Sequence, residues 1–431
     1  MGSRLTKSSI KSATNSPGGV LKEMNKLLIT GLCIGFSAFA LRAGDPAPLS
    51  HSSAPGNRQM AVNAMNDLIA HFWEGSPEDG HITRTWGGYH YSPLPNERGA
   101  LWERATLYFA MDNLHQLTGD PDLARRLSAE WHHVKSLYPA EKLQAVGEDS
   151  GTNWACDDAG WSALFYLAAY RATGDPDALA DAKGVVNNAY ARWLDNELGG
   201  GMWYADEKHV VNYDSISRRK SLYQIAIVLT SLHLYEITHE KAFLDPAMNC
   251  YDWMESHLLR PDGLYWCDYN SDGPLGASRP NDIHEAGSVS FLGGNMGMGA
   301  AHAILYRLTA DKKYRQRALR TATALRTGLL VNSNGIFIDD RDAWANGTFA
   351  GDWVREVLAL PGIVFEDRVV LQKTARAIYT KARTPDGYYG PCWDGVANGQ
   401  KCPWTNSWAQ QIMTSANAVN IIIAGAVAGS K

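Results

Sequence analysis

A degenerate repeat constrains the fold of this chain more than any other feature. Four apolar, helix-like segments each end in a related four-residue turn, at residues 117–120, 172–175, 237–240 and 308–311. Each turn is followed by a second helical pattern, and the turns are 55, 65 and 71 residues apart. Glycine at such a turn ends a helix, and the Asp-Pro found in the first two copies begins the next one. The repeating unit therefore contains a helical hairpin.

A second signature, a glycine followed by apolar and aromatic residues, comes after the second helix of each hairpin. Copies begin at Gly201, Gly263, Gly335 and Gly387, with a fifth expected at Gly87. The unit is thus helix, tight turn, helix and aromatic loop, and about six units fit the chain. We predict an all-α fold, an (α/α)6 barrel or toroid of six helical hairpins with the aromatic loops at one rim. An open solenoid is the alternative, but the chain ends lack polar capping repeats, which favours closure.

The amino-terminal segment predicts an exported protein. We interpret Met24 as the start of a signal peptide, with a short apolar run and small-residue cleavage sites after Ala40 or Ala43. The run is too short to favour a membrane-spanning helix. Residues 1–43 are therefore predicted to be a leader and residues 44–431 a single barrel domain, secreted or periplasmic, without a stable membrane span.

The charge balance disfavours one class of partner. Of 40 basic and 45 acidic residues, the leader holds six and one, which leaves 34 and 44 and a net charge of −10. A protein this acidic is not expected to bind nucleic acid, because phosphate contacts require a basic surface. The histidines show no spacing typical of metal ligands, so no metal is expected either.

Five cysteines remain after the leader, so at least one thiol is free. Cys392 and Cys402 flank a loop that contains Gly, with a Pro beside each cysteine, and we predict a disulfide between them in an oxidising compartment. A bridge between Cys250 and Cys267 is a second option. Cys156 is then the odd thiol. Because no histidine lies nearby in sequence to activate it, packing is preferred over a nucleophilic role.

Two adjacent carboxylates, Asp157 and Asp158, stand among aromatic residues at the start of a helix-like segment. Hydrolysis of a glycosidic bond usually requires two carboxyl groups, one to protonate the leaving oxygen and one to attack the anomeric carbon or activate water. Adjacent positions reach the roughly 5–5.5 Å separation of a retaining enzyme more readily than the wider inverting one. Two like charges this close drive their pKa values apart. The alternative is helix capping, since Asp is favoured in a first turn.

The chain resembles glycoside hydrolase family 76, whose members include bacterial endo-α-1,6-mannanases. The resemblance rests on the aspartate pair with Trp161, on the Gly-Gly-Met-Trp loop at 200–203 and on residues 349–355. It implies an (α/α)6 barrel and retaining cleavage of α-1,6-linked mannan without a metal or other cofactor. It also implies that Asp157 is the nucleophile and Asp158 the general acid/base.

Substrate-binding residues are expected where side chains of the repeated loops converge. The candidates are Trp161, Trp203, Tyr204, Trp266, Asn295, Trp353 and Arg355. Aromatic rings offer sugars an apolar stacking face, and Arg355 is expected to donate hydrogen bonds to hydroxyl groups. Packing between helices is the alternative for each ring. The chain departs from the family at residues 219–221 and 293–297, which leaves the preferred glycan open.

Three functions are consistent with these features. We favour a secreted, retaining endo-α-1,6-mannanase, a monomer acting on α-mannan or a related polysaccharide. The first alternative is another (α/α)6 carbohydrate enzyme, such as an unsaturated glucuronyl hydrolase or a cell-wall transglycosylase. An acidic sugar would need basic residues, and Arg218, Arg219, Lys220 and Arg355 keep that alternative open. The second alternative is a glycan-binding protein without catalytic activity.

Overall fold

Helices make up most of the described chain. The computed structural model describes residues 56–83, 101–147, 150, 153–206, 219–275, 277, 292–338, 345–395 and 412–430. These residues belong to one unit, Ala54–Lys431. The predicted leader, the fifth aromatic copy at Gly87 and the cysteine at Cys402 lie outside the described residues.

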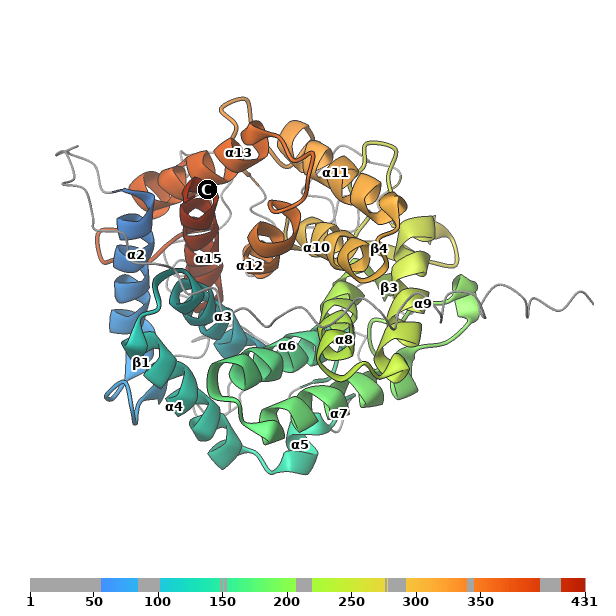
Figure 1. Cartoon of the computed structure of the whole chain (residues 1–431), viewed down its shortest axis with the longest axis horizontal. Helices are drawn as coiled ribbons and strands as arrows, with labels where there is room; N and C mark the ends of the chain where they lie inside the picture. Colours follow the sequence, from blue (N-terminus) through green and yellow to red (C-terminus); the bar gives the residue numbers. More distant parts are fainter. Residues whose placement is uncertain are drawn as a thin grey trace, which may run out of the picture. The chain divides into compact units, whose positions relative to one another are not determined.

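Within the described residues, six helical segments form an inner ring (Figure 1). They are α3 (Leu101–Thr118), α6 (Cys156–Thr173), α8 (Ile225–Thr238), α10 (Leu292–Thr309), the short α12 (Ala350–Asp352) continued by the π-helical η4 (Trp353–Val357), and α15 (Ile412–Gly429). Each contacts the next in this order, and α15 contacts α3. The contact between the last and first inner helices closes the ring and excludes the open solenoid.

An outer layer of helices alternates with the inner ring along the chain. Its members are α2 (Asn57–Phe72), α4 (Pro121–Leu137), α7 (Pro176–Trp193), α9 (Lys241–His257), α11 (Lys312–Thr327), and α13 (Phe365–Ala377) followed by η5 (Ile378–Ala382). These helices bury one stripe only; α4, for example, buries Leu123, Leu127 and Trp131 at intervals of four. Inner and outer layers together confirm the predicted all-α barrel.

The predicted turns between inner and outer helices have the expected local chemistry. Asp120, Asp175 and Asp311 each cap the following outer helix by accepting a hydrogen bond from the backbone N–H two residues later. The residue before each of these caps has a positive φ, and it is glycine in the first two copies and Ala310 in the last. The repeat therefore comes from a turn that these three hairpins share.

The Gly-aromatic signatures form small hairpins after the outer helices α7, α9, α11 and α13. Each is closed by an isolated β-bridge, Leu194 to Met202, Leu259 to Tyr265, Val331 to Phe337 and Arg383 to Tyr389. The preceding glycine has a positive φ in every copy, and at Gly201, where φ is 76°, an added Cβ would lie 2.7 Å from the Trp253 ring. Most of the aromatic side chains in these hairpins are buried, so the repeated signature is mainly structural.

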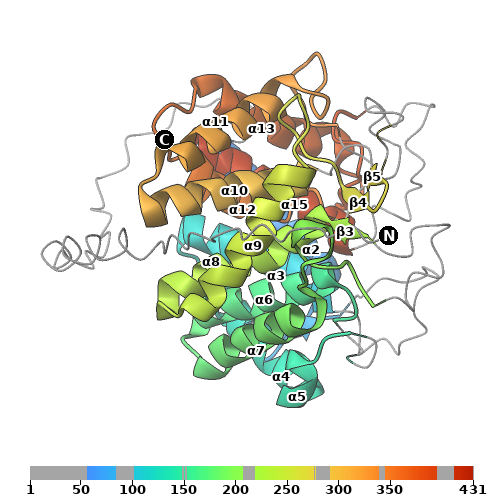
Figure 2. The same ribbon diagram turned by 90° about the vertical axis from the view of Figure 1, so that its right-hand side faces the viewer.

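The remaining elements are short. They are β1 (Trp73–Glu74), β2 (His81–Ile82), α5 (Ala140–Gln144), η1 (Glu197–Gly199), β3 (Lys220–Ser221), η3 (Leu222–Gln224), β4 (Asp268–Asn270) and β5 (Gly273–Pro274). Antiparallel pairing joins β1 to β2, and β4 lies between β3 and β5. Figure 2 shows the ring edge-on, with β3, β4 and β5 together at one side.

Close packing between inner helices places α6 tightly against α8. A Cβ added to Gly160 would lie 2.3 Å from the Ala226 Cβ, so only glycine allows this approach. The last inner helix, α15, is almost entirely buried. Among the described helices it alone is long and apolar enough to cross a membrane by length and composition, and its burial is what a core helix of a barrel requires.

The structure tests part of the disulfide prediction. Cys392 is disulfide-bonded, and its predicted partner Cys402 lies outside the described residues. The optional bridge between Cys250 and Cys267 is wrong, since neither cysteine forms a disulfide and both are buried. Burial and the charge of neighbouring Asp157 raise the pKa of the Cys156 thiol well above its usual value. This thiol is therefore not a ready nucleophile.

Candidate active site

The aspartate pair lies at the end of the ring where the inner helices begin, which we call the amino end. Inner and outer helices alternate along the chain, so the inner helices run parallel and the Gly-aromatic hairpins lead into their amino termini. Asp157 and Asp158 occupy the first turn of α6. The N-cap position of α6 is Ala155, which has no side-chain cap. The capping alternative therefore fails at the N-cap itself, although Asp157 accepts a hydrogen bond from the Asp158 N–H in the first turn.

A strip of extended backbone holds this helix start in place. Ala155 forms a β-bridge with Ala205, and the Cys156 N–H donates to the Tyr204 carbonyl at 2.8 Å. The neighbouring Trp203 forms a bridge with Lys220 of β3, which pairs in turn with β4. The hairpin after α7 and the segment before α8 are thereby fixed against the first turn of α6.

Asp157 is half-buried and well provided with hydrogen-bond donors. Its Oδ1 accepts from the Asp158 N–H at 3.0 Å, and its Oδ2 accepts from the Tyr204 hydroxyl at 3.3 Å. Burial raises the pKa of Asp157 to about 6, while the Asp158 N–H and the positive charge of Arg219 oppose the rise. Asp157 is consequently an anion at neutral pH.

Asp158 lies in a different environment only one residue away. Its side chain is 6% exposed, and its Oδ2 has no hydrogen-bond partner in the described part of the chain. Burial and the negative charge of Asp157 raise the pKa of Asp158 well above its usual value. Asp158 therefore holds a proton under conditions in which Asp157 has lost one.

Two residues connect Asp157 to a second carboxylate. The Arg219 guanidinium lies over the Tyr204 ring, 4.2 Å from its centroid, and Arg219 Nη1 donates to Asp268 Oδ2 at 3.3 Å. Asp268 is buried, and its other oxygen has no hydrogen-bond partner among the described residues. The contacts thus run from Asp157 through Tyr204 and Arg219 to Asp268.

Trp161 lies close to the pair. It follows Asp157 by four residues on α6 and so occupies the same face, one turn further along the helix. The ring is 6% exposed and its centroid is 5.1 Å from that of Phe349. Trp161 and Phe349 form apolar packing one turn below the carboxyl groups.

The side chains of Trp203 and Trp266 contact neighbouring residues of the protein and so help to hold the hairpins in place. Trp203 is half-buried; its indole N–H donates to Asp195, and the Lys220 ammonium lies 4.8 Å from its ring centroid. Trp266 is nearly buried, with the Arg260 guanidinium 4.3 Å from its ring. Tyr204, predicted to stack on sugar, points its hydroxyl at Asp157 instead.

Three predicted substrate contacts are corrected by the structure. Asn295 is completely buried, and its Oδ1 accepts the Tyr265 N–H at 3.1 Å, which secures a hairpin. Trp353 is buried against α10, where a Cβ on Gly299 would lie 2.3 Å from its ring. Arg355 lies toward the opposite end of the ring, where it donates to Asn113 and Gln116 in the carboxyl-terminal half of α3.

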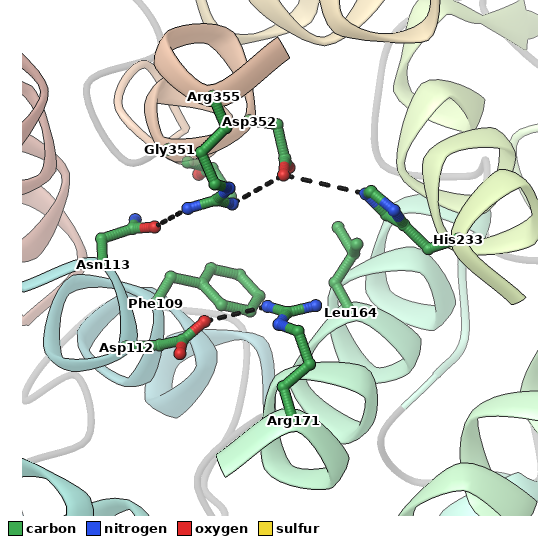
Figure 3. Close-up of a pocket in the computed structure, with 10 residues that line it drawn as sticks. Phe109, Asp112, Asn113, Leu164, Arg171, His233, Gly351, Asp352 and Arg355 are labelled. Carbon is green, nitrogen blue, oxygen red and sulfur yellow. Dashed lines mark hydrogen bonds and ion pairs between the residues drawn. The ribbon is translucent and has the colours of Figure 1, made fainter. Parts of the chain in front are cut away.

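Arg355 belongs to a polar pocket at that opposite, carboxyl end (Figure 3). The pocket is lined by Phe109, Asp112, Asn113, Leu164, Arg171, His233, Thr348, Gly351, Asp352 and Arg355. Arg171 stands in the last turn of α6, 14 residues beyond Asp157, so about 21 Å of helix separates the two at 1.5 Å per residue. The lining extends back along α6 only as far as Leu164, so neither aspartate of the pair lines this pocket.

Charges in the carboxyl-end pocket are paired with one another. Arg355 donates to Asn113 Oδ1 and to Asp352 Oδ1, both at 2.7 Å. Asp352 Oδ1 also lies 3.8 Å from His233 Nε2, and Arg171 Nη2 donates to Asp112 at 2.9 Å. These contacts join α3, α6, α8 and the fifth inner segment, so the pocket stabilises the ring.

Sequence reasoning missed two contributors to the amino end. Lys220 is buried and donates to the carbonyls of Gly200 and Gly201 at 2.6 and 3.1 Å, which fixes the Gly-Gly loop. The sequence suggests Lys220 only as part of a departure from the family and as a basic residue for an acidic sugar, not as a support for this loop. Asp268 carries no sequence signal, because its role depends on the pairing of β4 with β3. Within the described residues, no cluster of three or more His, Cys, Asp or Glu side chains is arranged to hold a metal.

Comparisons with known proteins agree with this geometry. The model of the family described as "Glycosyl hydrolase family 76" matches residues 57–428. An inactive variant of an α-1,6-mannanase of Salegentibacter sp. HEL1_6, in complex with α-1,6-mannotriose, is 16% identical with a TM-score of 0.64, over 86% of this chain and 99% of that one. A family 76 glycoside hydrolase from a bovine Bacteroides thetaiotaomicron strain is 18% identical with a TM-score of 0.63, over 86% and 78%.

A fungal protein shares the fold as well. Dfg5 from Chaetomium thermophilum, in complex with glucosamine, is 16% identical with a TM-score of 0.55, over 85% of this chain and 90% of that one. None of the curated protein sequences matches this chain significantly. At these identities the structural matches establish the barrel, and the family model establishes the family.

Proposed function

Because this chain belongs to glycosyl hydrolase family 76 and is therefore a glycoside hydrolase, we propose that it cleaves α-1,6-linked mannan with retention of configuration. The observation that carries the proposal is the unequal environment of two adjacent carboxyl groups at the amino end of the ring. Asp157 accepts two hydrogen bonds, whereas Asp158 has an oxygen without a partner. A retaining glycosidase needs one carboxylate and one protonated carboxyl group.

The related mannanase supports both the substrate and the pair. Its variant carries asparagine in place of two consecutive aspartates, is inactive and binds α-1,6-mannotriose. The same arrangement of two consecutive aspartates occurs here at Asp157 and Asp158. The proposal extends the mannan substrate to this chain on that basis.

In the proposed mechanism, Asp157 attacks the anomeric carbon while Asp158 donates its proton to the departing glycosidic oxygen. This step forms an ester between Asp157 and the sugar, and it leaves Asp158 as a carboxylate. Asp158 then accepts a proton from water, whose oxygen attacks the anomeric carbon and releases Asp157. The raised pKa of Asp158 suits the first step, and its return to a carboxylate suits the second.

The stereochemistry of the first product tests this mechanism. Proton NMR on a fresh digest of linear α-1,6-mannan should show the α-anomer first, followed by slow mutarotation. Initial release of the β-anomer would mean inversion and would exclude Asp157 as nucleophile. A chain that releases no reducing ends from mannan would favour a glycan-binding role, and longer products than the starting oligosaccharide would indicate transglycosylation.

Endo action, export and a monomeric state complete the proposal. An endo enzyme should lower the viscosity of a long mannan well before most reducing ends appear, whereas an exo enzyme would release mannose with little loss of viscosity. Export predicts that the mature protein begins after Ala40 or Ala43, which amino-terminal sequencing of the secreted protein tests. Light scattering should give the mass of one chain.

A further inference from the structure

A chain of contacts behind Asp157 has no counterpart behind Asp158. The Tyr204 hydroxyl donates to Asp157 Oδ2, and the guanidinium of Arg219 lies over the Tyr204 ring. Arg219 in turn donates to Asp268 on β4. Asp158 Oδ2, one residue from Asp157, has no hydrogen-bond partner within the described residues. The protein therefore places a side-chain donor and a positive charge near Asp157, whereas Asp158 receives only a backbone hydrogen bond from Ala155.

The backbone strip holds these groups in a defined order. The Tyr204 N–H donates to the Arg219 carbonyl at 2.9 Å, and the Tyr204 carbonyl accepts from the Cys156 N–H at 2.8 Å. On the other side, Ser221 pairs with Asp268 in the register of β3 and β4. Tyr204 and Arg219 are consequently positioned by the backbone next to the first turn of α6.

The positive charge of Arg219 affects the ionisation of the aspartate pair. Arg219 is largely buried, so its positive charge is screened by water less than that of a surface arginine. Both a hydrogen-bond donor and a nearby cation favour the ionised form of a carboxyl group. Asp158 receives neither from this chain of contacts, and the anion at Asp157 further favours its protonated form.

We propose that Arg219 is a positioning residue which, acting through Tyr204, assigns the anionic role to Asp157 and thereby leaves the proton on Asp158. Arg219 itself touches neither of the reacting carboxyl groups in any hydrogen bond of the described residues. The inference rests on the proposed function, since it concerns which of two catalytic carboxyl groups attacks.

Several ionisable groups face Asp157 and influence its titration. From α6 these are Asp158 and the Cys156 thiol, and from the other elements they are the Tyr204 hydroxyl and Arg219. Behind Arg219 stand Asp268 and Cys267 at β4 and Tyr223 of η3. Arg219 is the one cation in this described set, so its removal should change the titration of Asp157 more than that of Asp158.

The pH dependence of kcat/KM tests the proposal. For the unmodified enzyme we expect a bell whose acid limb lies near pH 6, because the pKa of Asp157 is raised to about 6. In Arg219→Met the acid limb should move upward by about one pH unit, because a neighbouring cation lowers a carboxyl pKa by roughly that amount or more. The basic limb should move less. Arg219→Lys, which keeps the charge, should return the acid limb toward its original position.

Tyr204→Phe provides a second variant that keeps the ring under Arg219 and removes only the hydroxyl. Its acid limb should also move upward, and this variant decides the matter if Arg219→Met fails to fold by circular dichroism. Arg126→Met is the matched control, because Arg126 lies 4.9 Å from the Trp73 ring on the outer layer. Its pH profile should keep both limbs in place.

Three results would overturn the proposal: an unmoved acid limb in both Arg219→Met and Tyr204→Phe, an equal shift of both limbs, or no rescue by Arg219→Lys. Failure of the proposed function is a different result. In that case the unmodified enzyme releases no reducing ends from α-1,6-mannan at any pH, or Asp157→Asn retains full activity.

Discussion

The two ends of the inner ring hold similar ionisable side chains that differ in their hydrogen-bond and charge partners. At the carboxyl end, Asp352 interacts with both Arg355 and His233, and Asp112 pairs with Arg171. At the amino end, Asp158 is buried with an oxygen that has no partner among the described residues. Buried charges are normally paired, and breaking a pair is costly. The carboxyl end therefore contributes to stability, whereas the Asp158 oxygen without a partner at the amino end carries an energetic cost of the kind found at functional sites.

The electrostatics of the two ends differ in sign. Arg355 and His233 hold the pKa of Asp352 well below its usual range despite burial. Burial and Asp157 raise the pKa of Asp158 instead. Identical residue types thus become a permanent anion at one end and a proton donor at the other, because of their neighbours alone.

The largest expected effect comes from replacing either member of the pair. Asp158→Asn should reduce activity by about 10²–10⁴-fold, which is the usual contribution of a general acid/base, and Asp157→Asn should abolish turnover through the ester. Thermal melting should be unchanged or slightly higher, since a buried carboxyl group is replaced by a neutral one. Initial rates on α-1,6-mannan and melting curves of the same samples measure both. Unfolding of both variants would instead support a structural role for the pair.

Asp352→Asn tests the opposite end with the same kind of substitution. It should lower the free energy of unfolding by about 1.5–3 kcal/mol, because it removes a charged partner from the half-buried Arg355. Activity per folded molecule should change little. Denaturant unfolding and rates corrected for the folded fraction measure the two effects. A loss of activity without a loss of stability would place catalytic function at the carboxyl end and break the comparison.

The carboxyl end should make its own contribution to the pH dependence of stability. Asp352 raises the pKa of His233 above 6.5 in the folded protein. The contribution of protonated His233 to the free energy of unfolding is therefore present below pH 6.5 and is lost as the pH rises through the folded pKa. The pKa of Asp352 is lowered, so ionised Asp352 stabilises the folded protein above about pH 3.8, and this stabilisation is lost in stronger acid. The pair should therefore stabilise most between about pH 4 and 6.5. His233→Gln should flatten the fall in melting temperature above pH 6.5, and an unaltered slope would assign that fall to other groups.

The smallest effect is expected at Trp203. Trp203→Phe removes the indole N–H that binds Asp195 and should cost about 1 kcal/mol of stability, the usual net value of a hydrogen bond. If Trp203 also stacks on sugar, the affinity for mannooligosaccharides should fall only slightly, because a ring is retained. Ligand titration of Trp203→Ala beside Trp203→Phe separates the two roles. Equal affinity in both variants would make Trp203 purely structural.

Sequence reasoning reached the barrel because its signals are local. A Gly or Asp at a hairpin turn acts within a few residues, as Asp120 and Asp175 show by capping the helices that they precede. The adjacency of Asp157 and Asp158 is likewise a property of the chain itself. Both features can therefore be predicted from the sequence without knowing which helices contact each other.

The misplaced residues depend on contacts between distant segments. Inner helices are buried nearly all round, so their apolar pattern does not tell which residue faces the centre or how far along the ring it lies. Asn295 and Trp353 consequently looked like cleft residues, although one secures a hairpin and the other packs on α10. Asp268 was missed because only strand pairing brings it to Arg219.

The measurement that tests the central claim most directly is trapping of the covalent intermediate. A slowly hydrolysed fluorinated α-mannoside should label the enzyme, and fragmentation of the labelled peptide by mass spectrometry can distinguish Asp157 from Asp158. Our account predicts one sugar bound through an ester at Asp157, with no label in Asp157→Asn. A label at Asp158, or an active enzyme that never forms an ester, would contradict it.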